Sequence, residues 1–196
     1  SLALDLEREG IRLEHLDVGG GLGIAYRAGQ PVLSVDEYAG AILDATPPHL
    51  HLLLEPGRWI VGPAGVLVAT VVDLKPQPDD GFFVILDAGM TDLLRPALYS
   101  AWHEIEPVTP RPGAPVPADI VGPVCESADT FAVRRALPPV DVGDLVAIRD
   151  TGAYGSVMAS NYNRRPTAAE AMTDADGSWR LVRRRQTAAD LLQWDV

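Results

Sequence analysis

The sequence predicts a mixed fold, α/β plus all-β, with an α/β segment at residues 1–58 and an all-β segment at residues 59–196. Before residue 58, stretches with helical spacing alternate with short apolar strands, which is the rhythm of an α/β barrel. After it, apolar runs of strand length are separated by Gly and Pro clusters, most densely at residues 76–78 and 107–117. This change of pattern places a domain boundary near residue 58.

The first segment is expected to run helix, strand, loop, helix, strand. Its first helix ends at Gly10, a residue that terminates helices well, and Ser34 is a suitable N-cap for the second. The expected elements are helices at 2–9 and 35–45 and strands at 13–18 and 51–54.

The second segment is expected to contain mostly strands. A short helix or turn is expected at residues 93–100, and Lys75, the only lysine of the chain, is expected in a loop before Pro76-Gln77-Pro78. The expected strands lie at residues 60–74, 81–87, 120–124, 145–150 and 179–184.

Composition excludes several classes of function. The net charge of -11 and the pI of about 4.6 argue against a nucleic-acid partner, which needs clustered Lys and Arg. The lone Cys125 allows no internal disulfide and favours a reducing, cytoplasmic setting. The longest apolar stretch, residues 59–74, is too short and too interrupted to span a membrane. Because the chain starts at Ser1 within an expected helix, we expect a fragment or a processed product.

A glycine run follows the first expected strand. Glycines at 19, 20, 21 and 23 would let backbone N–H groups approach a phosphate closely. The dinucleotide-binding fingerprint fails, because Ile24 or Tyr26 stands where its third glycine belongs. The alternative is a plain strand-to-helix turn.

The segment Glu55-Pro56-Gly57-Arg58 follows the next expected strand. Active residues of parallel barrels gather at the C-terminal ends of the strands, so this loop and the glycine run could hold one ligand. Glu55 could pair with a cationic ring nitrogen, and Arg58 with a phosphate or carboxylate. The alternative is an exposed turn flanked by two charges.

Further candidates lie in the second segment. Arg95 and Tyr99 share a face if their segment is helical, and such a pair could bind a substrate carboxylate. Tyr154 lies between glycines that allow a tight approach. Cys125 is a loop thiol without the second Cys or nearby His that a metal site needs, so no metal site is expected. The alternatives are a surface Arg beside a packing Tyr, a core Tyr and an inert Cys. The histidines at 15, 49, 51 and 103 are interpreted as structural or surface residues.

In their order, these motifs resemble the second half of a pyridoxal-phosphate (PLP) dependent decarboxylase of the diaminopimelate decarboxylase type. The resemblance covers nearly all of the chain but only about the C-terminal half of the family's length. It is carried by Leu16 to Ile24, Glu55 to Arg58, Asp87 to Met90 with Arg95 to Tyr99, Gly122 to Ser127, and Gly152 to Gly155.

The resemblance implies a fold, a cofactor and roles for residues. The fold would be the C-terminal part of a PLP-binding (β/α)8 barrel followed by a C-terminal β-barrel or sandwich domain, in a homodimer with shared active sites. Cys125 would be the catalytic thiol, reaching into the other subunit's site. PLP would contact Gly21, Glu55, Pro56, Gly57, Arg58 and Tyr154, and the substrate would contact Arg58, Arg95, Tyr99, Glu126 and Tyr154.

The implied reaction converts meso-2,6-diaminopimelate to L-lysine and CO2 in lysine biosynthesis. The lysine that forms the Schiff base with PLP belongs to the family's N-terminal half, and Lys75 is not expected to replace it. The chain alone is therefore expected to be inactive. Two alternatives stay open: a related decarboxylase of ornithine, arginine or carboxynorspermidine, and a non-catalytic module that pairs with a lysine-bearing chain.

Overall fold

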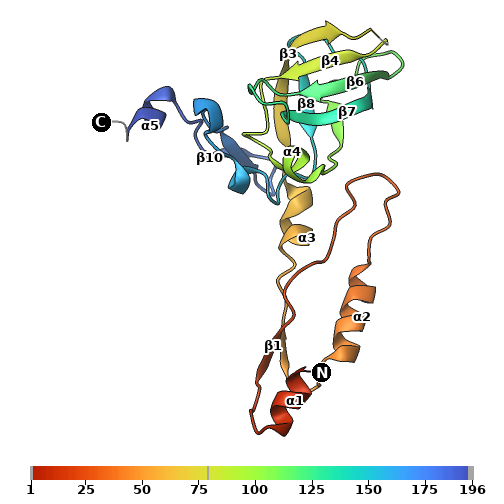
Figure 1. Cartoon of the computed structure of the whole chain (residues 1–196), viewed down its shortest axis with the longest axis vertical. Coiled ribbons are helices and arrows are strands. Elements are labelled where there is room, and N and C mark those ends of the chain that lie inside the picture. The colour runs from red at the N-terminus through yellow and green to blue at the C-terminus, as the bar shows by residue number, and fades with distance from the viewer. Residues whose placement is uncertain (1, 79, 194–196) are drawn as a thin grey trace.

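The computed structural model describes residues 2–78 and 80–193, and Figure 1 shows a curled β-sheet at one end and an extended α/β arm at the other. Within the described residues, six strands form the main sheet in the order β5-β8-β3-β4-β6-β7. They are β3 (Leu67–Pro76), β4 (Phe82–Leu86), β5 (Ile105–Pro107), β6 (Val116–Val121), β7 (Thr130–Leu137) and β8 (Leu145–Ile148).

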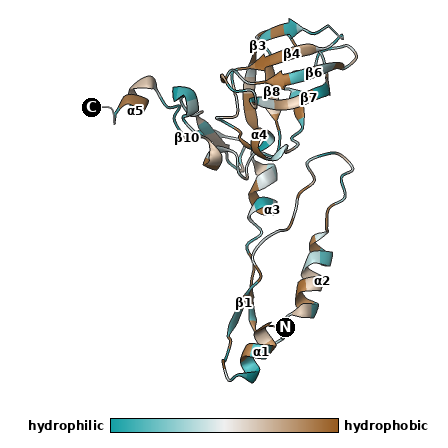
Figure 2. Ribbon diagram, in the orientation of Figure 1, coloured by the Kyte–Doolittle hydropathy of each residue, from teal (hydrophilic) through white to brown (hydrophobic). Residues whose placement is uncertain are grey.

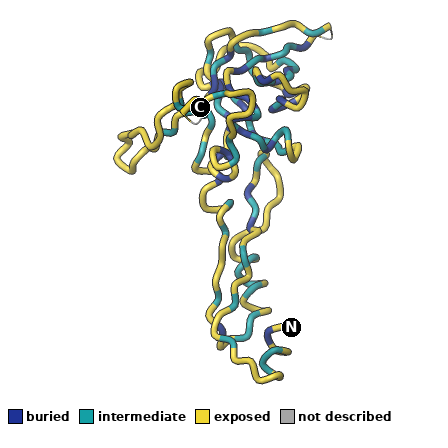
Figure 3. Tube along the Cα trace, turned by 60° about the vertical axis from the view of Figure 1, so that its left-hand side comes forward, coloured by how far each residue is buried: buried dark blue, intermediate teal, exposed yellow. Residues whose placement is uncertain are grey.

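The core lies inside this sheet because its strands alternate buried and half-buried residues. Val84 and Leu86 in β4 and Val146 and Ile148 in β8 are at most 2% exposed, while the residues between them are half-buried. Full burial of such a side chain contributes roughly 1.5–3 kcal/mol to stability. Figure 2 shows the apolar residues concentrated in these strands, and Figure 3 shows the buried residues concentrated at the same end of the molecule.

The arm contains one β-α-β unit. The strands β1 (His15–Asp17) and β2 (His51–Leu53) pair in parallel, and α2 (Val35–Ala45) lies between them in sequence. The helix begins where expected, because the Ser34 side chain accepts the Glu37 N–H and the Glu37 carboxylate accepts the Ser34 N–H. No residue of α2 is buried, and α1 (Leu2–Arg8) buries only Ala3.

The expected strand over residues 60–74 is wrong in its first part. Residues 57–61 form helix α3 (Gly57–Val61), a 3-10 turn follows at Gly62–Ala64, and β3 begins only at Leu67. A short apolar run does not distinguish a helix from a strand, and Pro63 is suited to the first turn of a helix but not to a paired central strand. Lys75 lies inside β3, opposite Phe83 of β4, and not in a loop.

The strand expected at 120–124 lies earlier, as β6 at 116–121, because residues after Val121 turn away to form a loop. The strands β5 and β7 were not expected, since a proline or paired arginines interrupt their apolar pattern. After β8 the described residues also form the hairpin of β9 (Glu170–Thr173) and β10 (Trp179–Arg183) and the helix α5 (Ala188–Leu192). The expected short helix is confirmed as α4 (Arg95–Tyr99).

Candidate active site

Two loops meet at the C-terminal ends of β1 and β2. The glycine run follows β1 and Glu55 follows β2, and the Gly19 carbonyl accepts the Glu55 N–H at 2.8 Å. Gly19 and Gly21 have φ of +70° and +98°, in the left-handed region that favours glycine. A Cβ at Gly20 would overlap the Glu55 carbonyl, so the close approach of the loops requires glycine there.

The glycine loop leaves several N–H groups unused. The Gly19 N–H donates to Asp17 Oδ1 at 2.8 Å, which fixes the start of the loop. Within the described residues, the N–H groups of Gly20, Gly21 and Gly23 have no hydrogen-bond partner. Such a row of donors behind a strand is suited to an anion.

A third loop joins the first two. Helix α3 places Arg58 so that its guanidinium carbon lies 5.5 Å from the centre of the Tyr154 ring. The Tyr154 loop is held against the end of α3, because the Gly152 N–H donates to the Gly62 carbonyl at 3.1 Å. Tyr154 itself has a φ of +59°, which is uncommon for a residue with a side chain and is typical of functional sites. The structure therefore brings together the expected residues Gly21, Glu55, Pro56, Gly57, Arg58 and Tyr154.

Arg95 and Tyr99 differ in burial. Arg95 is 7% exposed, and its Nη1 lies 2.9 Å from Nε2 of His103. Tyr99 is 62% exposed, because α4 ends at Ser100 with the ring on the solvent side. The two residues lie four positions apart in the helix α4, as the shared face requires, although only Tyr99 is exposed in this chain.

Cys125 and Glu126 are exposed on a separate loop. Glu126 Oε2 accepts a hydrogen bond of 3.4 Å from the Tyr162 hydroxyl. In the part of the chain that the structure describes, no hydrogen bond, ion pair or ring contact joins this loop to Glu55, Arg58 or Tyr154.

Asp129 holds the Cys125 loop in place. Its carboxylate is 4% exposed and accepts the Val124 N–H at 2.7 Å and the Met90 N–H at 2.6 Å. Burial raises the pKa of the Asp129 carboxyl, although these two backbone N–H groups act to lower it. A Cβ at Gly122 would overlap this carboxylate, so the glycine gives the loop room to wrap around it.

Sequence reasoning gave no special role to Asp129 or His103. His103 could have been recognised from its spacing, because it alternates with Ile105 and Pro107 and all three are buried. The role of Asp129 could not, because its two N–H donors lie in loops 39 and 5 residues away.

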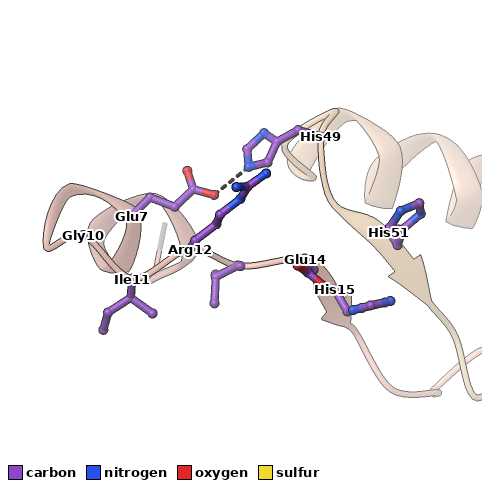
Figure 4. A pocket seen from close by; sticks show the side chains of 9 residues that line it. Glu7, Gly10, Ile11, Arg12, Glu14, His15, His49 and His51 are labelled. Carbon is purple, nitrogen blue, oxygen red and sulfur yellow. Dashed lines mark hydrogen bonds and ion pairs between the residues drawn. The ribbon is translucent and has the colours of Figure 1, made fainter.

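One hollow in the described part of the chain lies away from these loops. Figure 4 shows it beside His15, His49 and His51, with Glu7 Oε1 2.6 Å from Nε2 of His49. Its volume is about 620 Å³, and it lies at the N-terminal ends of β1 and β2, opposite the glycine loop. A second hollow of about 390 Å³ is lined by Tyr26, Arg27, Gln30, Arg95, Ala101 and Trp102.

Among the described residues, no three His, Cys, Asp or Glu side chains are grouped closely enough to hold a metal ion. In the same residues, no helix combines the length and the apolar character needed to cross a membrane.

Comparison with curated proteins finds similar diaminopimelate decarboxylases. The chain is 49% identical over 188 residues to the diaminopimelate decarboxylase of Vibrio cholerae, covering 95% of this chain and 44% of the relative. It is 48% identical to that of Pseudomonas aeruginosa, with 95% and 44% covered. The chain thus spans less than half the length of these relatives.

Solved structures agree. Diaminopimelate decarboxylase from Helicobacter pylori complexed with L-lysine matches with a TM-score of 0.90 and 42% identity, over 98% of this chain and 47% of that one. Lysine/ornithine decarboxylase from Vibrio vulnificus complexed with cadaverine matches with a TM-score of 0.75 and 30% identity, over 85% and 45%. Residues 24–152 match the family model described as the C-terminal sheet domain of pyridoxal-dependent decarboxylases. With two thirds of its length in that match, the chain belongs to the pyridoxal-dependent decarboxylase family.

Proposed function

We propose that this chain forms the C-terminal part of a PLP-dependent decarboxylase that converts meso-2,6-diaminopimelate to L-lysine and CO2. The observation that carries this proposal is the meeting of the glycine loop, Glu55, Arg58 and Tyr154 at one end of the β1–β2 pair. The names of these two relatives support the choice of substrate.

The residues at this end of the pair fit PLP. Its phosphate would be held by the unpartnered N–H groups of Gly20, Gly21 and Gly23. Glu55 would face the pyridine nitrogen and favour its protonated form. When bound, PLP supplies an electron sink for the electron pair left by the departing CO2. Arg58 and Tyr154 would flank the cofactor on the side of the third loop, with Pro56 and Gly57 shaping the turn between Glu55 and α3.

The remaining residues would bind the substrate and move a proton. Diaminopimelate carries an ammonium and a carboxylate at its far end. Glu126 would bind the ammonium, and Arg95 with Tyr99 would bind the carboxylate. Cys125 would then donate its thiol proton to the substrate carbon that has lost CO2. Because Cys125 lies on a loop apart from Arg58 and Tyr154, it would act in the site of a second subunit of a homodimer.

The proposed function also assigns a domain to each part of the chain. Residues 1–58 would be the last strands and helices of a (β/α)8 barrel, of which the β1-α2-β2 unit is one repeat, and residues 59–196 would be the β domain. The exposed residues of α2 would be covered by the rest of the barrel. A cytoplasmic location would suit such a biosynthetic enzyme.

A second candidate is decarboxylation of a basic amino acid without a far carboxylate, such as ornithine. The likeness to the lysine/ornithine decarboxylase of Vibrio vulnificus favours it. In that case Arg95 would have no carboxylate to bind at the far end of the substrate. A non-catalytic module that pairs with a lysine-bearing chain is the remaining alternative.

The test joins the N-terminal half of the Vibrio cholerae enzyme to this chain, which we call the fusion protein. We expect it to release CO2 from meso-diaminopimelate with a kcat/KM well above that for ornithine or arginine. Arg95→Gln should reduce this preference, because it removes the charge that recognises the far carboxylate. Preference of the unmutated fusion protein for ornithine would contradict the proposed substrate, and no turnover of any amino acid would contradict a catalytic role.

A further inference from the structure

We propose that His103 is a positioning residue that orients the Arg95 guanidinium while leaving its positive charge free for a substrate carboxylate. This inference deepens the proposed function and rests on it for the role of Arg95. It is carried by the partners of the two ring nitrogens of His103, by the surroundings of Arg95 and by the hollow beside it.

The partners of His103 fix its protonation. Nδ1 lies 2.8 Å from the backbone carbonyl oxygen of Arg149, and Nε2 lies 2.9 Å from Nη1 of Arg95. A carbonyl oxygen only accepts hydrogen bonds and a guanidinium only donates them. The proton of His103 must therefore be on Nδ1, and the lone pair of Nε2 must face Arg95. The ring is neutral.

The surroundings keep His103 in this form. The side chain is 1% exposed, and burial is the main cause that lowers the pKa of its imidazole. The charges of Arg95 and Arg135 lower the pKa further, while the Arg149 carbonyl and Asp150 act in the opposite direction. Arg135 also donates to the His103 carbonyl at 2.9 Å, so the backbone of His103 is fixed as well as its ring.

Because the His103 ring is neutral, it leaves the positive charge of Arg95 uncompensated, which a carboxylate partner would not do. A guanidinium paired with Asp or Glu has its charge compensated, whereas one held by a neutral imidazole keeps it. In the described part of the chain, Arg95 makes no ion pair, and its guanidinium carbon stands 4.8 Å above the Tyr26 ring. His103 occupies one of the five N–H donors of Arg95 and leaves others for a ligand.

The hollow beside Arg95 fits an anion. It is lined by Arg95 and Arg27, and also by Tyr26 and Trp102. The Tyr26 hydroxyl and the Trp102 indole N–H are buried and have no hydrogen-bond partner within the described residues. The cavity thus combines two cations with two unused hydroxyl and N–H donors, in a chain whose net charge is -11. A carboxylate in this hollow would pair with its two cations, Arg95 and Arg27.

The protonation of His103 can be measured on the chain as it stands. The sequence has four histidines, so ring 15N signals can be assigned with single His→Gln variants. We expect His103 at pH 7 to show a protonated Nδ1 and an unprotonated Nε2. A protonated Nε2 or a charged ring would overturn the inference, whatever the outcome of any activity assay.

The positioning role is tested in the fusion protein with a double-mutant cycle. We expect His103→Leu to raise KM for meso-diaminopimelate about 10- to 100-fold, with a smaller change in kcat, because a hydrogen bond to a charged group is lost. His103→Gln should recover much of this loss, since its amide oxygen can accept from Arg95. His49→Leu is the matched control and should leave KM unchanged.

The cycle separates positioning from a general structural role. In the Arg95→Gln background, His103→Leu should have little further effect on KM, because the residue through which it acts is gone. An equal rise of KM in both backgrounds would overturn the inference and leave the proposed function standing. An unmutated fusion protein without turnover would instead contradict the proposed function and, with it, the binding role of Arg95.

Discussion

Asp129 should be a main determinant of the loop that carries Cys125, and its replacement by Ala tests this. The carboxylate is 4% exposed and holds two backbone N–H groups, those of Met90 and Val124, at 2.6 and 2.7 Å. Asp129→Ala would remove both acceptors and leave one buried and one half-buried N–H donor without partners.

The size of the effect follows from these contacts. Each hydrogen bond to a charged group contributes about 1.5–3 kcal/mol, so the two together contribute about 3–6 kcal/mol. Burial of the charge offsets part of this, as the raised pKa of the Asp129 carboxyl indicates. We therefore expect Asp129→Ala to lower the free energy of unfolding by about 2–4 kcal/mol, and Asp129→Asn, which keeps one acceptor, by less.

The assay combines urea unfolding with hydrogen exchange on the chain. The Val124 and Met90 amides should exchange about 30- to 1000-fold faster in Asp129→Ala, which corresponds to the same range of free energy. The exposed Asp44→Ala on α2 serves as the control and should change neither quantity. A free energy of unfolding of Asp129→Ala within about 0.5 kcal/mol of that of the unmutated chain, together with unchanged hydrogen exchange of the Val124 amide, would refute the reasoning.

The direction of the pH dependence is also determined. Because the folded-state pKa of Asp129 is raised above its ordinary value of 3.8, the protonated form is the one that folding favours. The contribution of Asp129 to stability is fully present below 3.8 and decreases as the pH rises through the folded-state pKa. The advantage of the unmutated chain over Asp129→Asn should therefore be largest in acid and decrease toward neutral pH.

Two further predictions concern single residues. In the fusion protein, Cys125→Ala should lower kcat by about 100- to 10,000-fold with a much smaller change in KM, because a proton donor acts in the transition state; near-normal kcat would leave Cys125 a packing residue. Arg111 forms a two-point pair with Asp144 at 2.6 and 2.7 Å and lowers the pKa of that carboxyl from 3.8 to about 2. The unmutated chain should therefore be more stable than Asp144→Asn above pH 3.8, and this difference in stability should disappear as the pH falls toward 2. A difference in the free energy of unfolding by urea that stays constant across this pH range would count against the pair.

Local signals in the sequence were sufficient for some elements. Helix α2 was predicted with its bounds from its helical spacing and from Ser34 as a suitable N-cap, and the structure adds that Glu37 completes a capping box with Ser34. The helix at Arg95–Tyr99 and the joining of the Glu55 and glycine loops also followed from neighbours in sequence and from the parallel order of strands.

Other features depend on contacts that a local pattern does not contain. Residues 57–61 are helical because the chain after Glu55 has no strand to pair with until β3 reaches β8 at Leu67. The loop after Val121 exists because Asp129 draws the Val124 N–H inward. The burial of Arg95 involves a contact with His103, which lies beyond the end of α4. In each case the partner is distant in sequence or on another element.

The central claim of the proposed function is that this chain would hold most of a PLP site but not the lysine that binds the cofactor covalently. Lys75, the one lysine in the sequence, lies eight residues into β3 from Leu67, which is about 26 Å along the strand at about 3.3 Å per residue. The most direct test is a PLP titration followed by absorbance, with the chain alone and with the fusion protein. We expect the long-wavelength band of lysine-bound PLP in the fusion protein and none in the chain alone. A stable band in the chain alone that disappears on Lys75→Ala would contradict the claim.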